Sequence, residues 1–173
     1  YYIGRYEVGT ENDTAVVKAN QTPYASIVWS KAYELANGIG GGIAAETHLC
    51  SSYAWDTAIN FIQNTSTPNY ATSTEGMNEN WSDREVVDAS GNVIKASGTG
   101  QRLNTGLTTA KTNIFDIGGN VIEFTTEVNP GVGEAVVLRG NNYGWTDSAG
   151  LRIDNGTTRS DDALGLRATL FLK

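Results

Sequence analysis

The residues best suited to chemistry on their own are the single histidine and the single cysteine, His48 and Cys50, which stand two positions apart. A cysteine close to a helix N-terminus has a lowered pKa, so a thiolate nucleophile assisted by an imidazole is one interpretation of the pair. On an extended segment, however, two side chains at this spacing need an unusual bend to meet, and no third group is evident. We therefore expect Cys50 to be a small buried apolar residue and His48 to lie in a loop or on the surface.

The stretch RGNNYGWTDSAG, residues 139–150, carries a different kind of chemistry. Two large aromatic residues, Tyr143 and Trp145, stand there among short polar side chains. Rigid rings bring a large amphipathic contact area at low entropic cost, and Asn, Asp and Ser add adaptable hydrogen bonds. Alternate residues of an extended segment face the same side, which places Tyr143, Trp145 and Asp147 together. The pattern favours a binding surface; the alternative is that one ring packs into the core.

This surface is expected to continue along the polar residues that follow, up to residue 163. Alternation points Leu151 and Ile153 inward. Arg152, Asp154 and Asn155 are then expected outside. The alternative is an ordinary solvated loop, because exposed charge pairs contribute only about 0–1 kcal/mol to stability. The expected ligand-binding residues are Asn142, Tyr143, Trp145, Asp147, Ser148, Arg152, Asp154, Asn155, Arg159, Asp161 and Asp162.

The composition suits one loop-rich globular domain, which we place over residues 1–173: 39% of residues are apolar, 18% are charged and 20 are glycine. The net charge of −7 repels phosphate backbones and anionic membranes, so nucleic acid is not an expected partner. No apolar stretch reaches the roughly 18 residues that cross a bilayer, so we expect no direct membrane insertion. Because position 1 is Tyr, the sequence is expected to belong to a longer or processed product.

Two helices are expected in the first third of the chain. SKAYELANG predicts a short one, with Ser30 as its N-cap and Gly38 just beyond its last turn. LCSSYAWDTAINFIQN predicts a longer one, which Ser51 caps. The apolar stripe of the longer helix is expected to consist of Trp55, Ala58, Ile59 and Ile62.

Strands are expected at the start of the chain and throughout its last third. YYIGRYEVG predicts an opening strand, and a short hairpin is expected around Gly91-Asn92 within a long polar stretch. Apolar and polar residues alternate in NIFDIGGNVIEFTTEV, EAVVLRG and ALGLRATLFLK. Early helices followed by late strands predict an α+β domain.

Four segments follow one another along the chain in a familiar order. They are IGRYEV, LCSSYAWDTA, NIFDIGGNVIEF, and VVLRGNN with LGLRATL. Together they resemble the formylglycine-generating enzyme and sulfatase-modifying-factor domains, and the third segment, which resembles that family's NVxDMxGNVWEW, is the most specific. The resemblance spans nearly the whole chain. It implies a C-type-lectin-like fold of the formylglycine-generating-enzyme subtype, with two helices packed on mostly antiparallel sheets and the terminal strands adjacent.

The chain departs from that family where the chemistry lies. The family's oxidases hold copper with two cysteines in the C-terminal part, whereas nothing after Cys50 supplies the thiolate that Cu(I) prefers. The related ergothioneine-pathway sulfoxide synthases need three histidines for iron, and His48 is the only histidine here. We therefore expect no catalytic cofactor and no enzymatic activity. The alternative is a sulfatase-modifying-factor-type enzyme with an unrecognised site.

A narrower resemblance covers residues 135–170, AVVLRGNNYGWTDSAGLRIDNGTTRSDDALGLRATL. This stretch resembles the variable region of diversity-generating-retroelement target proteins, RGGxWxxGxxAG followed by IGFR, with Asn141 and Leu166 as departures. In bacterial and phage proteins of this class the scaffold stays fixed, while exposed positions coded by adenine-rich triplets are rewritten. Residues 141–163 have the composition typical of such hypervariable positions. The resemblance implies a receptor- or adhesin-like protein, displayed on a cell surface or phage particle, that binds a protein or glycan on a cell or phage surface; a structural piece of a phage tail or surface fibre is the alternative.

The segment DIGGNVIE matches positions that hold calcium in formylglycine-generating enzymes. Carboxylates and backbone carbonyls are the hard oxygen ligands that Ca²⁺ needs, so the resemblance implies a structural calcium site. The alternative is that Asn120 and Glu123 only satisfy buried backbone groups of a tight turn. Arg139 and Arg167 fall where the family has structural arginines, so we expect both to belong to the scaffold. The implied calcium ligands are Asp116, Gly119, Val121 and Glu123.

Overall fold

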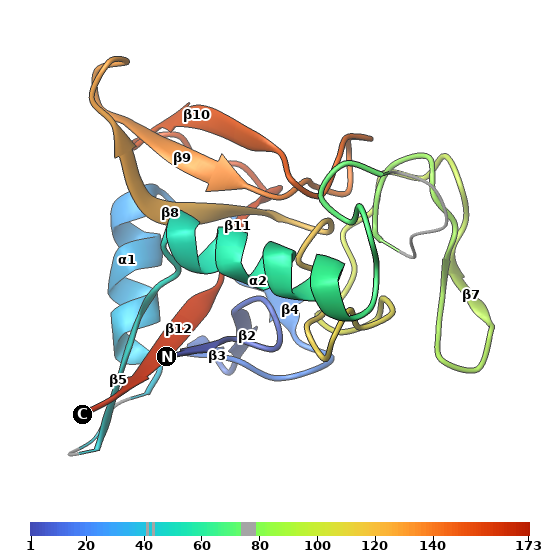
Figure 1. Ribbon diagram of the computed structural model, residues 1–173, viewed down its shortest axis with the longest axis horizontal. Helices are drawn as coiled ribbons and strands as arrows, with labels where there is room; N and C mark the ends of the chain where they lie inside the picture. Colours follow the sequence, from blue (N-terminus) through green and yellow to red (C-terminus); the bar gives the residue numbers. More distant parts are fainter. Residues whose placement is uncertain (41, 43, 74–78) are drawn as a thin grey trace.

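The computed structural model describes residues 1–40, 42, 44–73 and 79–173 of the chain. Within this range it contains two helices and four small sheets, which is the α+β arrangement expected from the sequence (Figure 1). The long polar stretch in the middle of the chain does contain short strands. Its residues 74–78, where further ones were expected, lie outside the described residues.

One sheet joins the two ends of the chain. Its order is β1 (Tyr2–Ile3), β12 (Ala168–Leu172), β5 (Ala45–Leu49), with both pairings antiparallel. The expected adjacency of the terminal strands is thus confirmed. The opening strand is shorter than predicted, because the chain leaves the sheet after β1 and turns inward, burying Glu7 completely.

The second sheet supports the segment expected to bind ligand. Its order is β10 (Arg152–Gly156), β9 (Ala135–Arg139), β8 (Ile122–Asn129), β11 (Leu164–Leu166), and only β11 pairs in parallel, with β8. Strand β9 is buried throughout, whereas the alternation predicted for EAVVLRG implied one exposed face. The loop from residue 140 to residue 151 connects β9 to β10, so both of its ends start from hydrogen-bonded strands.

The two remaining sheets are small. One has the order β3 (Thr14–Val16), β2 (Gly9–Glu11), β4 (Thr22–Pro23). The other is the hairpin of β6 (Val86–Val87) and β7 (Val93–Lys95), which projects at the right of Figure 1. Its position confirms the hairpin predicted around Gly91-Asn92. Gly91 has a φ of +84°, a backbone conformation that favours glycine.

Helix α2 (Ser52–Thr65) forms as the sequence predicted. The Ser51 hydroxyl accepts a hydrogen bond from the Ala54 amide at 3.1 Å, which satisfies one of the free donors of the first turn. The expected stripe is buried, and each large apolar side chain buried in this way stabilises the fold by about 1.5–3 kcal/mol. The buried residues of the stripe are Trp55, Ala58, Ile59 and Ile62.

Helix α1 (Trp29–Gly38) begins one residue earlier than its predicted cap. Val28 occupies the N-cap position without a side-chain bond, Ser30 lies inside the helix, and Gly38 is its last residue, so the predicted caps were wrong. A tertiary contact satisfies one free donor of the first turn, because the Trp29 amide donates to the Thr157 carbonyl at 3.2 Å, and the Trp29 indole also donates to the Thr125 carbonyl at 2.9 Å. The helix packs through buried Ala32 and Ala36, chiefly against β5 of the first sheet and also against β8 and β11 of the second.

Candidate ligand-binding site

The loop between β9 and β10 is tied down along its backbone. The Tyr143 amide donates to the Asn120 carbonyl at 3.0 Å, and the Ser82 amide donates to the Trp145 carbonyl at 3.1 Å. Near the end of the loop, the amide of Gly150 donates at 2.8 Å to a carbonyl in the loop that follows α2. Partners from three separate parts of the chain therefore fix the course of this loop.

Two asparagines shape the start of the loop from inside. Asn141 is fully buried, and its side-chain amide donates to the Asp147 carbonyl at 3.1 Å. Asn142 is 3% exposed, and its amide oxygen accepts the Gly144 N–H at 2.8 Å. Asn142 was expected to be exposed and to contact ligand. The predicted exposure is wrong, because the side chain points inward and closes the turn.

Beyond these asparagines the side chains turn outward. Trp145 is 46% exposed and Tyr143 is half-buried. Both line a pocket of about 260 Å³, together with Arg159 and Asp161 from the loop between β10 and β11. Asn142 lines the pocket as well, so the structure brings five of the predicted ligand-binding residues together, and it confirms that at least one aromatic ring is exposed.

The polar groups at this pocket are paired but not enclosed. Burial of the ring, reinforced by a hydrogen bond and the negative charge of Asp162, raises the pKa of Tyr143 to about 12. The phenol therefore stays protonated at neutral pH and donates to Asp162. One guanidinium nitrogen of Arg159 lies 3.7 Å from Asp161, an exposed pair of little energetic value. Ring faces, donors and acceptors together equip the pocket for recognition.

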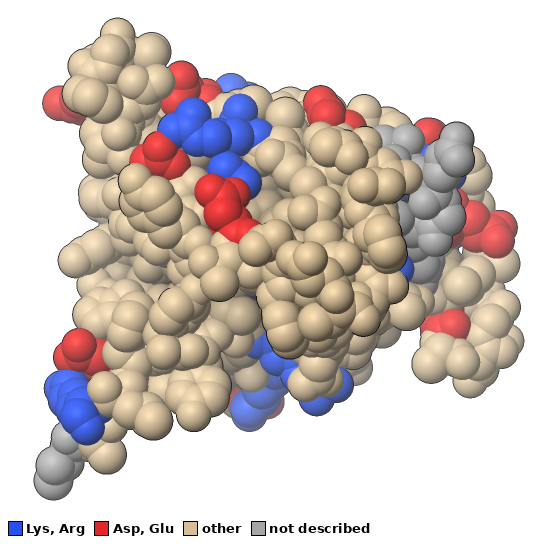
Figure 2. All heavy atoms as spheres, viewed as in Figure 1, with Lys and Arg blue, Asp and Glu red and all other residues tan. Residues whose placement is uncertain are grey.

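The predicted residues on β10 lie elsewhere. Arg152 and Asp154 point outward, Arg152 pairs with Glu127, and Asp154 accepts a bond from the Asn129 amide at 2.9 Å. Asn155 is 6% exposed, so its predicted exposure is wrong. The reason is the alternation of the strand, which turns residue 155 to the same side as residue 153. Charged side chains of both signs meet over this region in Figure 2.

The predicted set therefore divides between two places. Asp154 and Asn155 line a separate hollow of about 350 Å³ beside the turn between β8 and β9. Asp147 is exposed within the β9–β10 loop, and its carboxylate accepts the amide of half-buried Ser148 at 2.6 Å. The pocket lined by Tyr143 and Trp145 is the concave site that brings together five members of the predicted set.

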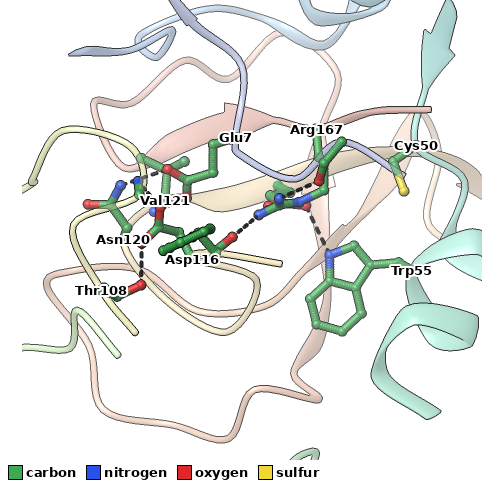
Figure 3. A network of polar contacts seen from close by, with 12 residues as sticks. Glu7, Cys50, Trp55, Thr108, Asp116, Asn120, Val121 and Arg167 are labelled. Carbon is green, nitrogen blue, oxygen red and sulfur yellow. Dashed lines mark hydrogen bonds and ion pairs between the residues drawn. The ribbon is translucent and has the colours of Figure 1, made fainter. Parts of the chain in front are cut away.

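Both predicted scaffold arginines are buried. Arg139 pairs with Asp56, and its guanidinium lies 4.9 Å from the centre of the Trp55 ring. Arg167 is fully buried and donates from Nε to Glu123 at 2.8 Å (Figure 3). Such a pair is costly to break, because a lone buried charge would remain.

The calcium ligands implied by the resemblance do not fit a cation. Both oxygens of Asp116 accept hydrogen bonds of 2.6 Å, from the Thr108 hydroxyl and a backbone amide. Both oxygens of Glu123 are likewise occupied, by Arg167 and by the Trp55 indole. The Arg167 guanidinium already supplies the counter-charge to Glu123, and its positive charge also acts on Asp116. Over the described ranges, no group of three or more metal-binding side chains occurs.

Asn120 connects this buried network to the candidate site. Its amide nitrogen donates to Glu7 at 2.6 Å, and its amide oxygen accepts bonds from Asn80 and from the Leu103 backbone. Its carbonyl receives the Tyr143 amide, as described above. The alternative interpretation of this segment, that Asn120 satisfies buried polar groups, agrees with these contacts.

The histidine and the cysteine occupy the positions expected of them. Cys50 is fully buried, and burial raises the pKa of its thiol, which donates weakly to the Ser51 carbonyl at 3.5 Å. His48 lies at the surface, where Nε2 is 3.3 Å from a Glu46 oxygen and the ring contacts Phe171. A raised thiol pKa opposes formation of the nucleophilic thiolate.

Sequence reasoning missed Ser82 and Asp83, which touch the β9–β10 loop. The Thr146 hydroxyl donates to the Asp83 carboxylate at 2.7 Å and lies 3.0 Å from the Ser82 hydroxyl. These partners are more than 60 residues apart in the sequence. No local pattern signals such a contact.

The fold that carries this site is C-type-lectin-like, of the kind found in formylglycine-generating-enzyme-like domains. No family model matches the sequence, and no curated protein matches it. Several solved structures are similar, and the three described next are all below 25% identity, so the likeness concerns the fold alone.

The first of these structures is CarF, with a TM-score of 0.61 and 15% identity over 86% of this chain and 67% of that one. PvdO from Pseudomonas aeruginosa has a TM-score of 0.61 and 13% identity, and the match covers 96% of this chain and 78% of that one. Treponema denticola variable protein 1 has a TM-score of 0.53 and 14% identity. The match covers 94% of this chain but only 60% of that protein's length. A lectin-like scaffold is thereby supported.

Proposed function

We propose that this chain is a non-enzymatic, receptor- or adhesin-like variable protein of a diversity-generating retroelement, in which side chains between residues 141 and 163 bind the ligand. The observation that carries the proposal is the contrast within the β9–β10 loop. Its backbone is hydrogen-bonded to three other parts of the chain, while Trp145 is 46% exposed. A fixed backbone with outward side chains is what recognition requires.

The contrast also explains how one scaffold serves different ligands. Binding is weakened when a loop must be ordered at the moment of contact, and a loop that is already ordered avoids this loss. Substitutions at exposed positions usually change stability by less than about 0.5 kcal/mol. Side chains at the pocket rim can therefore be exchanged, whereas Asn141 and Ala149, both fully buried, belong to the frame.

The proposed partner is a protein or glycan on a cell or phage surface. A pocket with two aromatic rings, one guanidinium and one carboxylate offers both apolar contact and hydrogen bonding. The net charge of −7 disfavours nucleic acid. The fold similarity to a variable protein supports this class of function, and the rarity of cysteine and histidine, together with the fully buried Cys50, supports binding without turnover.

In the decisive experiment, peptide binders are selected from a phage-displayed library on the wild-type domain, and glycan binders are found by probing a glycan array with the same domain. Binders are then tested on the double variant Tyr143→Ala/Trp145→Ala and on Tyr53→Ala, a control ring on α2 that is 84% exposed. We expect the double variant to lose at least about thirtyfold in affinity, as central aromatic contacts do, and the control to lose none.

The melting temperature separates the two interpretations of these rings. If they are ligand contacts, it changes little in the double variant. A large fall would mean that the rings support the core, and unchanged binding would place the site elsewhere. The neighbouring DNA gives an independent check, because a near-copy of the coding stretch for residues 141–163 beside a reverse transcriptase gene is expected.

A further inference from the structure

A buried lysine closes the excursion of the chain between residues 81 and 99. Lys95 is 2% exposed, and its ammonium group donates to three backbone carbonyls. These belong to Trp81 at 2.8 Å, Arg84 at 2.6 Å and Thr99 at 3.1 Å. An ammonium group has three donors and no acceptor, so this arrangement satisfies it completely. The two ends of the β6–β7 hairpin are thereby held together.

The closed excursion contacts the β9–β10 loop at its most exposed part. The Ser82 amide bonds the Trp145 carbonyl, and the Thr146 hydroxyl donates to the Asp83 carboxylate. Because that proton is used, the Ser82 hydroxyl is the donor in its 3.0 Å contact with Thr146. Three hydrogen bonds thus hold Ser82 and the exposed Asp83 against the backbone of Trp145 and the side chain of Thr146.

The same excursion is anchored just before Ser82. The Trp81 indole is fully buried and donates to the Gly118 carbonyl at 2.7 Å. The side-chain amide of the preceding residue, Asn80, donates to Asn120 at 2.8 Å. Asn120 also receives the Tyr143 amide, so one buried residue positions both walls of the surface.

We propose that Asp83 and Trp145 form a subsite for a cationic side chain, a lysine or arginine of a protein partner. The inference rests on the proposed ligand-binding function. A carboxylate forms charge-assisted hydrogen bonds to ammonium or guanidinium groups, which are about twice as strong as neutral ones. Tryptophan is the aromatic ring that attracts cations most strongly through its face.

Both groups are accessible for such a contact. The Asp83 side chain is 54% exposed, and one of its oxygens already accepts the Thr146 hydroxyl, which orients the carboxylate. The neighbouring Arg84 is turned over the Trp81 ring, 6.0 Å from its centre, and its Nε is 3.8 Å from Asp83. That long contact leaves the carboxylate open to a second cation, and the net charge of −7 favours the approach of one.

The position of Asp83 has a consequence for specificity. It lies outside residues 141–163, so the carboxylate itself is retained whatever side chains those positions carry, although the Thr146 hydroxyl that orients it belongs to that segment. Different versions of the binding segment would therefore share a preference for a positive charge at this edge. Specificity elsewhere on the surface would vary.

In the test, peptides are selected from a phage-displayed library on the wild-type domain. Their affinity for the wild type is then compared with their affinity for Asp83→Asn and for Asp13→Asn. Asp13 is an exposed aspartate in the turn between β2 and β3 and serves as the matched control. We expect lysine and arginine to be enriched among the selected peptides. We expect Asp83→Asn to weaken them about tenfold and to reduce the salt dependence of binding, with no effect of the control.

The outcomes separate this subsite from the function on which it rests. Peptides that lose affinity for Tyr143→Ala/Trp145→Ala but bind Asp83→Asn normally, or that lack basic residues, would overturn the subsite and leave the proposed function standing. Selected peptides whose affinity is unchanged for Tyr143→Ala/Trp145→Ala and for Asp83→Asn would overturn both the subsite and the proposed function. An unchanged melting temperature of Asp83→Asn is required, and Asp83→Glu, which keeps the charge, is expected to restore most of the affinity.

Discussion

A buried glutamate, Glu79, makes the stability of this protein depend on pH in an unusual direction. The side chain is 1% exposed, one of its oxygens accepts the Tyr70 hydroxyl at 2.5 Å, and the other has no partner among the described residues. Burial raises the pKa of Glu79 to about 7, although the Tyr70 bond opposes the change and the charge of Asp116 adds to it. Replacing it with glutamine keeps the shape and removes the ionisation.

The magnitude follows from the difference between folded and unfolded states. Because the folded pKa of Glu79 lies above its ordinary value of 4.5, the stabilisation is fully present below pH 4.5 and is lost as the pH rises to about 7. A tenfold change in an ionisation constant is worth about 1.4 kcal/mol, so the whole loss is about 3 kcal/mol. Burial also raises the pKa of Glu7, Asp116 and Glu123, which contribute in the same direction.

The assay is urea unfolding followed by tryptophan fluorescence, from about pH 4.5 to about pH 8. We expect the wild type to lose free energy of unfolding across this range, and Glu79→Gln to lose about 3 kcal/mol less. Glu134→Gln, at an exposed glutamate, is the control and should follow the wild type. Parallel curves for the wild type and Glu79→Gln, or a wild type that gains stability toward pH 8, would refute the reasoning.

Further predictions concern the buried network and the exposed indole. Lys95→Met is expected to lower the free energy of unfolding by about 3 kcal/mol in urea titrations, because three carbonyls lose their donor, and Lys95→Arg should restore part of it. Arg167→Met should cost at least about 3–5 kcal/mol, since buried carboxylates lose their counter-charge, and a smaller loss by calorimetry would contradict the pairing described. Trp145→Phe should remove the largest share of the acrylamide-quenchable fluorescence, because Trp145 is exposed, Trp29 is only partly buried, and Trp55 and Trp81 are fully buried; undiminished quenching would show an opened core. EDTA should leave the melting temperature unchanged, and a fall would reinstate calcium at Asp116.

Much of the fold was accessible from the sequence, because local signals and tertiary packing agree there. Helix α2 has a capping serine and an apolar stripe, and both act in the structure as predicted. The strands predicted in the last third form β8, β9 and β11 of one sheet and β12 of another, and the two terminal strands are adjacent, as the family resemblance implied. The caps of α1 failed because a donor at the start of that helix, the Trp29 amide, bonds the distant Thr157 carbonyl, a contact that no local pattern encodes.

The candidate site was predictable in its composition and only partly in its geometry. The exposed Trp145 and the pocket it shares with Arg159 agree with the polar, aromatic pattern. The burial of Asn142 depends on one turn hydrogen bond, and that of Asn155 on the alternation of a strand that had not been predicted. The contribution of Asp83 arises from contacts across the chain, where sequence carries no signal.

The pairing of β1 with β12 determines how the molecule can be presented. In Figure 1 both chain ends lie at the lower left, whereas β7 and the loop that follows β9 lie toward the right. A linker joined to either end would therefore leave from one pole of the molecule. Attached to a bead, a virion or a sensor chip by such a linker, the domain would hold Trp145 and Asp83 toward the medium, in reach of a passing partner.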